Sequence, residues 1–214
     1  MKKWYFCLIC LFCTASITQG QYYRQDNGFL LGVNAGYSYP LGDMGKILKN
    51  GLGGNVAGKY LINHVIGIGF EAGYHSFKSK VLLSNDNTDQ DYKCRLIPVL
   101  LDASFYMPNW DHTILPYLGI HFGAYLTNIK VSRRSDIYGI PTLSKKLFIV
   151  SPGVGLNAGS LFELSEQVYL DFKIRVDYVP KVEDSYQFDE NTPGNIGFDE
   201  ILNIGANIGL LYKF

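Results

Sequence analysis

The residue types of a hydrolytic site recur along the middle of the chain. Glu71 and His75 share one segment, Asp102 and Ser104 share a second, and His121 lies in a third. Serine, histidine and a carboxylate together can supply a nucleophile, a base and an orienting acid, so one hypothesis is a lipid hydrolase. That hypothesis requires a hydroxyl such as that of Ser104 within hydrogen-bond reach of His75 or His121. The interpretation we favour is a network of hydrogen bonds and ion pairs without catalysis, and we expect no enzyme activity.

A second run of charges alternates in position with apolar residues near residue 174. Asp171, Lys173, Arg175 and Asp177 are two residues apart, so on a strand they would all point to one side. With the first group they form a predicted polar network of eight residues: Glu71, His75, Asp102, His121, Asp171, Lys173, Arg175 and Asp177. Their spacing is not diagnostic of a metal site, and we expect neither a metal nor another cofactor.

A glycine-rich stretch from Gly53 to Tyr60 matches most of a phosphate-binding P-loop. Tyr60 stands where the Mg²⁺-binding Ser or Thr should be, and the segment has the pattern of a strand with no helix after it. Because a phosphate site needs the start of that helix, we do not predict one here.

The elements that would position these residues are strands. Apolar residues alternate with small or polar ones along the chain, most clearly from Asn203 to Phe214, where Leu211 is an exception on the polar face. A period of two gives a sheet with one apolar and one polar face. The pattern predicts eight strands: 28–39, 52–62, 65–78, 93–106, 114–130, 146–159, 167–180 and 203–214.

The predicted connections alternate in length without exception. Residues 63–64, 108–112 and 160–166 form short ones, whereas 40–51, 79–92, 131–145 and 181–200 form long ones. Short turns on one side and long loops on the other are typical of an antiparallel up-and-down β-barrel that crosses a membrane.

Energetics then assigns the two faces. A charge that faces lipid at the bilayer centre costs about 2–4 kcal/mol, so the face with Glu71 and Arg175 should line the lumen. Tyrosines near strand ends suit the two membrane interfaces: Tyr39, Tyr60, Tyr74, Tyr178 and Tyr212. The alternative is a soluble barrel of the lipocalin type, with the apolar face inward. Pro98, Pro116 and Pro152 fall inside strands, where we predict bulges or strand ends.

The first twenty residues have the features of a cleavable signal peptide. Lys2 and Lys3 precede an apolar stretch, and Thr18-Gln19-Gly20 offers small residues before a cut at Gln21. We therefore expect 1–20 to be removed and 21–214 to form the barrel domain. Only Cys94 lies in that domain, so we expect no disulfide within it. The formal net charge of the whole chain is zero, so no net field attracts nucleic acid and we expect no such partner.

The chain resembles the outer-membrane β-barrel-domain proteins of Bacteroidota, sometimes called PorT-like. The similar stretches are Arg95–Tyr106, Pro116–Leu126, Gly153–Gly155 and Ile204–Phe214. The resemblance implies an outer-membrane barrel, and some relatives serve a secretion machinery. The last residues resemble the aromatic signal read by the barrel-assembly machinery, which implies that machinery as a transient partner and Tyr212 and Phe214 as the signal.

Three functions remain open at this point. The first, which we favour, is a structural or interaction role for a barrel whose lumen is filled by side chains. Its partners would be outer-membrane lipid and an envelope protein. It would act through long external loops or in envelope assembly. The others are a narrow channel or small-ligand transporter, and the lipid hydrolase. Basic residues surround the third long loop (Lys130, Arg133, Arg134, Lys145 and Lys146) and acidic ones the fourth (Glu183, Asp184, Asp189, Glu190 and Asp199), so the loops could pair, bind lipopolysaccharide phosphates, or simply be solvated.

Overall fold

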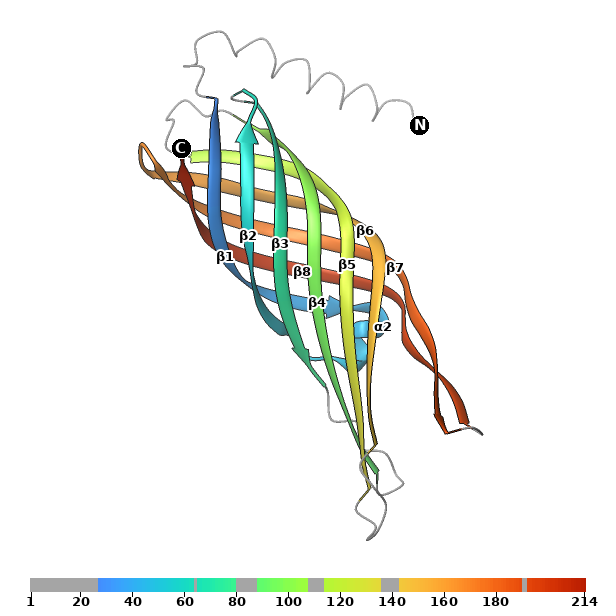
Figure 1. The fold of residues 1–214 in the computed structure, drawn as a ribbon. Helices are drawn as coiled ribbons and strands as arrows, with labels where there is room; N and C mark the ends of the chain where they lie inside the picture. The colour runs from blue at the N-terminus through green and yellow to red at the C-terminus, as the bar shows by residue number, and fades with distance from the viewer. Residues whose placement is uncertain (1–26, 64, 80–87, 108–113, 136–142, 190–191) are drawn as a thin grey trace, which may run out of the picture.

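The chain folds into one closed barrel of eight strands (Figure 1). The computed structural model describes residues 27–63, 65–79, 88–107, 114–135, 143–189 and 192–214, and within these ranges it leaves the side chains of 88–92, 131–135, 143–145, 181, 183–189 and 192–197 undescribed. The strands are β1 (Gly28–Leu41), β2 (Gly51–Leu61), β3 (Ile66–Lys78), β4 (Thr88–Tyr106), β5 (Ile114–Ser135), β6 (Leu143–Ser165), β7 (Val168–Asp189) and β8 (Thr192–Lys213). The predicted signal peptide lies outside the described residues.

Each strand pairs antiparallel with its neighbours in sequence, and β1 closes the barrel against β8. The up-and-down topology is therefore confirmed. The start of β1 and the end of β8 lie at the same end of the barrel as the short turns, which we call the turn end. The extended hairpins lie at the opposite end, the hairpin end (Figure 1).

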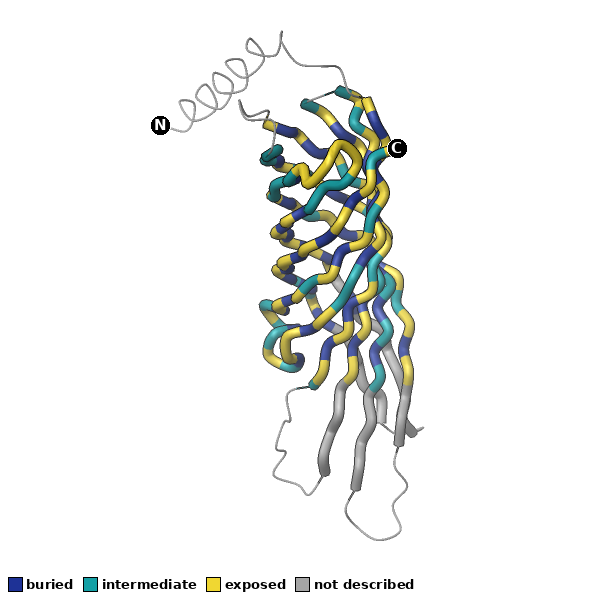
Figure 2. Tube along the Cα trace, turned by 90° about the vertical axis from the view of Figure 1, so that its left-hand side faces the viewer, coloured by how far each residue is buried: buried dark blue, intermediate teal, exposed yellow. Residues whose placement is uncertain are grey.

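Side chains alternate between the two faces along every strand, as the banded tube in Figure 2 shows. The aliphatic face is the outer one: Val33, Leu52 and Ile120 keep between 59% and 70% of their surface exposed. Glu71, Arg175 and Asp177 are buried inside. The lipocalin alternative, which needs the reverse, is wrong for this chain. The five tyrosines expected at the interfaces are likewise exposed on the outside: Tyr39, Tyr60, Tyr74, Tyr178 and Tyr212.

Parts of three of the four predicted long loops are strand. β5 runs on to Ser135, β6 begins at Leu143, and β7 and β8 form a hairpin that reaches Asp189 and Thr192. These segments lack a sustained period-two apolar pattern in the sequence, so they were predicted as loops, although Val182 and Phe198 at the base of the last hairpin are buried. The first loop instead contains a short helix, α2 (Gly42–Ile47), which packs against β1 and β8. No helix among the described residues is long and apolar enough to span a membrane.

The prolines fit the sheet in different ways. Pro116 lies near the start of β5, as predicted. Pro98 and Pro152 lie within strands, and the register shifts along the described ladders occur elsewhere, near Glu163 and Asp189. At Pro98 two pairs are missing from the β3–β4 ladder, and the β6–β7 ladder begins two residues after Pro152. Proline has no N–H to donate to a neighbouring strand, and at both positions a ladder of paired residues is interrupted or absent.

The interior is layered along the barrel axis. Strand β5 shows the order: Tyr117, His121, Tyr125 and Ile129 all point inward, from the turn end to the hairpin end. An apolar cluster at the turn end, the turn-end cluster, consists of Leu30, Tyr106, Tyr117, Leu161 and Leu211. A larger one, the hairpin-end cluster, includes Phe77, Cys94, Leu96, Val179 and Ile201, with Met44 and Leu48 from the first connection over it. Polar side chains fill the space between the two.

Candidate functional site

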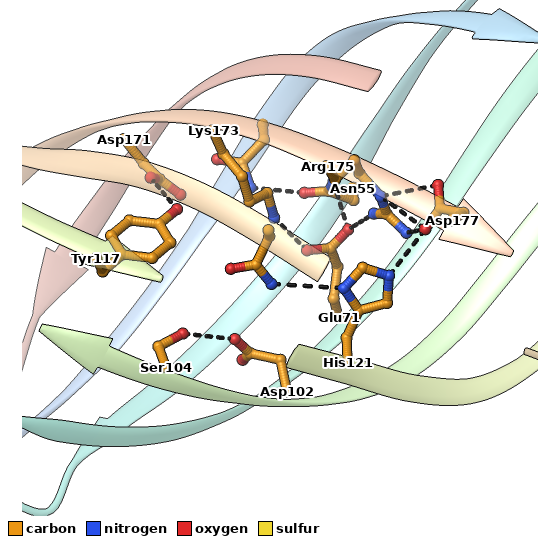
Figure 3. A network of polar contacts seen from close by, with 12 residues as sticks. Asn55, Glu71, Asp102, Ser104, Tyr117, His121, Asp171, Lys173, Arg175 and Asp177 are labelled. Atoms are coloured by element: carbon orange, nitrogen blue, oxygen red, sulfur yellow. Dashed lines mark hydrogen bonds and ion pairs between the residues drawn. The ribbon is translucent and has the colours of Figure 1, made fainter. Parts of the chain in front are cut away.

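The polar layer centres on two buried carboxylates (Figure 3). Glu71 on β3 accepts a hydrogen bond from Asn55 at 2.8 Å and forms ion pairs with Lys173 and Arg175 of β7. Asn34 of β1 in turn donates to Asn55 at 2.6 Å. One carboxylate thus ties the first three strands to the seventh across the lumen.

Asp177 is the second centre of this network. Its Oδ1 atom lies 2.6 Å from Arg175 Nη2 and 2.9 Å from His121 Nε2, and it accepts from the Tyr125 hydroxyl at 2.7 Å. Its Oδ2 atom accepts from Asn203 at 3.1 Å. Arg175 therefore bridges Asp177 and Glu71. We call the connected set the central network; its members are Asn34, Asn55, Glu71, His121, Tyr125, Asn157, Lys173, Arg175, Asp177 and Asn203.

The charges of the central network compensate one another. Two cations, Lys173 and Arg175, face two carboxylates, Glu71 and Asp177, and all four side chains are at most 9% exposed. Desolvated charges of this kind are tolerated when they are paired and hydrogen-bonded, whereas removing one partner leaves a costly uncompensated charge. These ion pairs and hydrogen bonds connect opposite walls of the barrel across the lumen.

The remaining predicted residues lie apart from this set. Asp171 accepts from the Tyr117 hydroxyl at 2.7 Å, and Ser104 donates to Asp102 at 2.8 Å, both nearer the turn end. Lys59 lies beside them, with its ammonium 4.2 Å from the centre of the Tyr117 ring, a cation–π contact. The predicted network is thus one cluster of five residues (Glu71, His121, Lys173, Arg175 and Asp177) and separate pairs for the other three.

His75 belongs to a pair of its own. Its Nδ1 atom lies 3.0 Å from the Ser38 hydroxyl, and the two side chains are 3% and 1% exposed. The pair is enclosed in the barrel, so a lipid substrate has no path to it through the described wall.

The hydrolase geometry is not assembled. Among the described hydrogen bonds, those of Ser104 lead to Asp102, and those of His121 lead to Asp177 and Asn157. The Ser104 hydroxyl therefore meets neither histidine, although general-base activation needs the two within hydrogen-bond reach. The Ser38 hydroxyl does lie beside His75, but among the described hydrogen bonds no carboxylate orients that ring.

A small cavity lies between the central network and Asp102. Its volume is about 10 Å³, and it is lined by Glu71, Leu100, Asp102, His121, Asn157, Lys173 and Arg175. That is room for about one water molecule, and the polar lining supplies several partners for it. Within the described residues, no group of three or more His, Cys, Asp or Glu side chains is placed to hold a metal ion.

Sequence reasoning missed the neutral members of the network. Asn55 and Asn157 share the inward face of their strands with glycines, and Tyr125 lies four residues from His121, on the same side. Counting by twos from Lys59 and His121 would have found Asn55 and Tyr125, because side chains two apart on a strand share a face. Asn157 had no such signal, since no charged residue shares its face in the predicted strand 146–159.

The C-terminal aromatics lie at the rim of the turn end. Tyr212 and Phe214 are 42% and 72% exposed, and their rings pack edge to face at 5.0 Å. The Phe214 N–H donates to the Phe29 carbonyl at 2.9 Å, which fastens the end of the chain to β1. Of the basic and acidic loop residues, only Lys130, Lys146 and Asp199 have described side chains.

The comparisons with known proteins agree with this geometry. Neisserial surface protein A is 22% identical, with 87% of this chain and 97% of that one covered at a TM-score of 0.56. OprG from Pseudomonas aeruginosa is 14% identical over 89% and 97%, also at 0.56. Ail, the attachment invasion locus protein of Yersinia pestis, is 16% identical over 88% and 99%, at 0.52.

These likenesses show the fold of outer-membrane barrels. No curated protein matches the sequence. The model of the outer membrane protein beta-barrel domain matches residues 7–214, nearly the whole chain. The chain belongs to this family of outer-membrane β-barrel proteins.

Proposed function

We propose that the protein is a sealed outer-membrane barrel with a structural or interaction role, which it performs through its outer surface and its extended hairpins. The observation that carries the proposal is the layered lumen, in which an apolar cluster closes each end of a braced polar layer. Eight-stranded barrels have interiors just wide enough for side chains to fill. A function is then left to the exposed parts of the molecule.

The sealed lumen disfavours a channel or transporter. Tyr106 and Tyr117 are fully buried across the turn end, and Met44 and Leu48 are fully buried over the hairpin end. Water avoids such apolar constrictions, and ions need water to pass them. The proposal likewise assigns no catalysis to the enclosed histidines.

Recording from planar bilayers tests the seal. The purified barrel should give no stepwise conductance above the leak, whereas a general porin inserted in the same bilayers supplies the positive control. Regular openings from the wild-type barrel would contradict a sealed lumen and favour the channel.

The role of the hairpins is tested by shortening one of them. In the described part of the β7–β8 hairpin, residues 186–189 pair with residues 192–194 and with no other strand. A two-residue Asn-Gly turn in place of 186–194 therefore leaves the pairs of the barrel in place. In cells that lack the wild-type protein, the shortened form should fold but fail to restore the envelope barrier, measured as uptake of a hydrophobic dye. Full restoration would show that this hairpin is not the working part.

The family resemblance to the PorT-like proteins of Bacteroidota supports an assembly role in the envelope as the more specific form of this proposal. We also infer that Tyr212 and Phe214 act as the assembly signal, because both aromatic side chains stay exposed at the rim of the turn end. Phe214→Ala should slow insertion in a reconstituted assembly reaction. Phe29→Ala, at the neighbouring ring 6.2 Å away, is the matched control and should insert at the normal rate.

A further inference from the structure

Four lysines stand side by side on the outside of the barrel near the hairpin end. Lys78 of β3 is the direct partner of Lys93 of β4, Lys93 is the partner of Lys130 of β5, and Lys130 is the partner of Lys146 of β6. Directly paired residues on neighbouring strands project from the same face of the sheet. Three of the four are exposed and Lys130 is half-buried. We call this set the lysine row.

Two more basic residues lie next to the row, one beside Lys78 and one along β4 from Lys93. The Lys49 N–H donates to the Lys78 carbonyl at 2.7 Å, which places a fifth, exposed lysine beside the row. Arg95 is exposed on the outer face of β4, two residues closer to the middle of the barrel than Lys93. With strands about 4.8 Å apart, the row itself spans roughly 14 Å of the barrel circumference.

Such a row has an electrostatic cost. Like charges directly opposite each other on adjacent strands destabilise a sheet. Among the residues that the structure describes, no carboxylate forms an ion pair with Lys78, Lys130 or Lys146. An anionic ligand that neutralises several of these ammonium groups at once would remove the repulsion.

The surface next to the row is the apolar outer wall. On β6, Phe148 and Val150 follow Lys146 on the same face towards the middle of the barrel, and they are 57% and 58% exposed. On β5 and β4 the same face carries Phe122 and Val99. In an outer-membrane barrel this wall meets acyl chains, so the lysines stand where the headgroups of those chains begin.

We propose that the lysine row, with Lys49 and Arg95, binds the phosphorylated headgroup of an outer-leaflet glycolipid, the phosphate groups on the lysines and the acyl chains on the apolar wall. The chemistry required of the ligand is an amphiphile with phosphates close to its acyl chains, which is the chemistry of lipid A in lipopolysaccharide. Lysine binds phosphate as a compact cation, and clusters of lysines at a membrane surface bind anionic lipid. The site concerns the outer surface, so it does not depend on whether the lumen conducts.

The experiment measures binding of the purified full barrel to bisphosphorylated lipid A and to the same lipid with both phosphates removed. Wild-type protein should bind the phosphorylated form at least tenfold more tightly, and added salt should weaken that preference. The triple variant Lys78→Gln, Lys130→Gln, Lys146→Gln should lose between about tenfold and a hundredfold in affinity for it. The charge-preserving triple Lys→Arg at the same positions should retain binding, and Lys46→Gln, an exposed lysine on α2, should change nothing.

Folding is controlled by mobility on unheated gels and by urea unfolding. The Gln triple should be at least as stable as the wild type at low salt, because it loses like-charge repulsion. Equal binding of the dephosphorylated lipid would overturn the proposal, because the apolar wall alone would then account for the affinity. Equally tight, competing binding of a soluble polyanion such as heparin or DNA would also overturn it, since the acyl chains would then contribute nothing.

Discussion

At the scale of single residues, Arg175 is the brace of the lumen because it bonds both central carboxylates. Lys173 pairs with Glu71, which keeps its bonds to Arg175 and Asn55 when that lysine is lost. Arg175→Met should therefore cost about 3–5 kcal/mol of unfolding free energy, since Asp177 loses its guanidinium partner and Glu71 loses one of its two cations. Lys173→Met should cost less, about 1–3 kcal/mol.

Reversible urea unfolding in detergent or lipid gives the two free energies. Arg175→Lys, which keeps a charge but not the fork of donors, should fall between wild type and Arg175→Met. Equal costs for the Arg175 and Lys173 variants would mean that the bridge to Asp177 contributes nothing.

Glycines on the inward face make room for this network. A Cβ on Gly155 would lie 2.2 Å from both the His121 Nε2 atom and the Val176 carbonyl oxygen. On Gly205 the nearest atom would be the Arg175 Cγ at 3.0 Å, which belongs to a flexible side chain. Gly155→Ala should cost about 1–3 kcal/mol by overpacking, and Gly205→Ala under about 1 kcal/mol. The same unfolding measurement decides; a Gly205 variant as damaged as the Gly155 variant would show that contact with backbone is not the cause.

At the scale of elements, α2 works as a lid on the lumen. Met44 is fully buried in the hairpin-end cluster, while Lys46 of the same helix is 77% exposed and pairs with Asp43 at 2.7 Å. Met44→Ala should remove much of the apolar contact that holds the helix. Hydrogen exchange should then quicken in α2 and the adjacent outer half of β8, and stay unchanged at the turn end. Lys46→Ala is the matched control, and uniform quickening throughout the barrel would argue against a local lid.

The sequence predicted the elements that face lipid and missed those that do not. Eight strands and the inward position of Glu71 and Arg175 followed from alternation, because a bilayer outside and a polar lumen inside impose a strict period of two. The extensions of β5 and β7 were missed, since their sequences lack the sustained period-two alternation of the barrel strands. α2 was missed because six residues carry too little periodicity.

The clusters inside the lumen show where pattern reasoning ends. Leu211 broke the polar face of the last strand, and the structure explains it as a member of the turn-end cluster. Which side chains bond one another depends on the register of strands that can be far apart in sequence, 104 residues for Glu71 and Arg175. Register is set by the closure of the whole sheet, so single-strand patterns cannot give the Ser38–His75 pair, whereas Ser104 and Asp102 pair within one strand.

At the scale of the whole molecule, orientation decides which surfaces can meet partners. Short turns and both ends of the barrel chain lie together, and export places such turns in the periplasm and long hairpins outside. The lysine row and α2 would then face the outside. Cys7, Cys10 and Cys13 leave with the expected signal peptide, and Cys94 is buried, so the processed wild-type protein should stay unlabelled by a maleimide. Single introduced cysteines can then report on each end of the barrel.

Asp43→Cys, on α2, should react with a membrane-impermeant maleimide in intact cells. Glu166→Cys, in the turn between β6 and β7, should react only after the outer membrane is permeabilised. Both positions are on the surface and far from the central network, so neither substitution should change the heat-dependent gel mobility expected of a closed barrel. The reverse labelling pattern would invert the barrel and move the lysine row to the periplasmic leaflet, where lipopolysaccharide is not its neighbour. Labelling thus tests the premise that the hairpin proposal and the lipid proposal share, and it does so independently of either binding experiment.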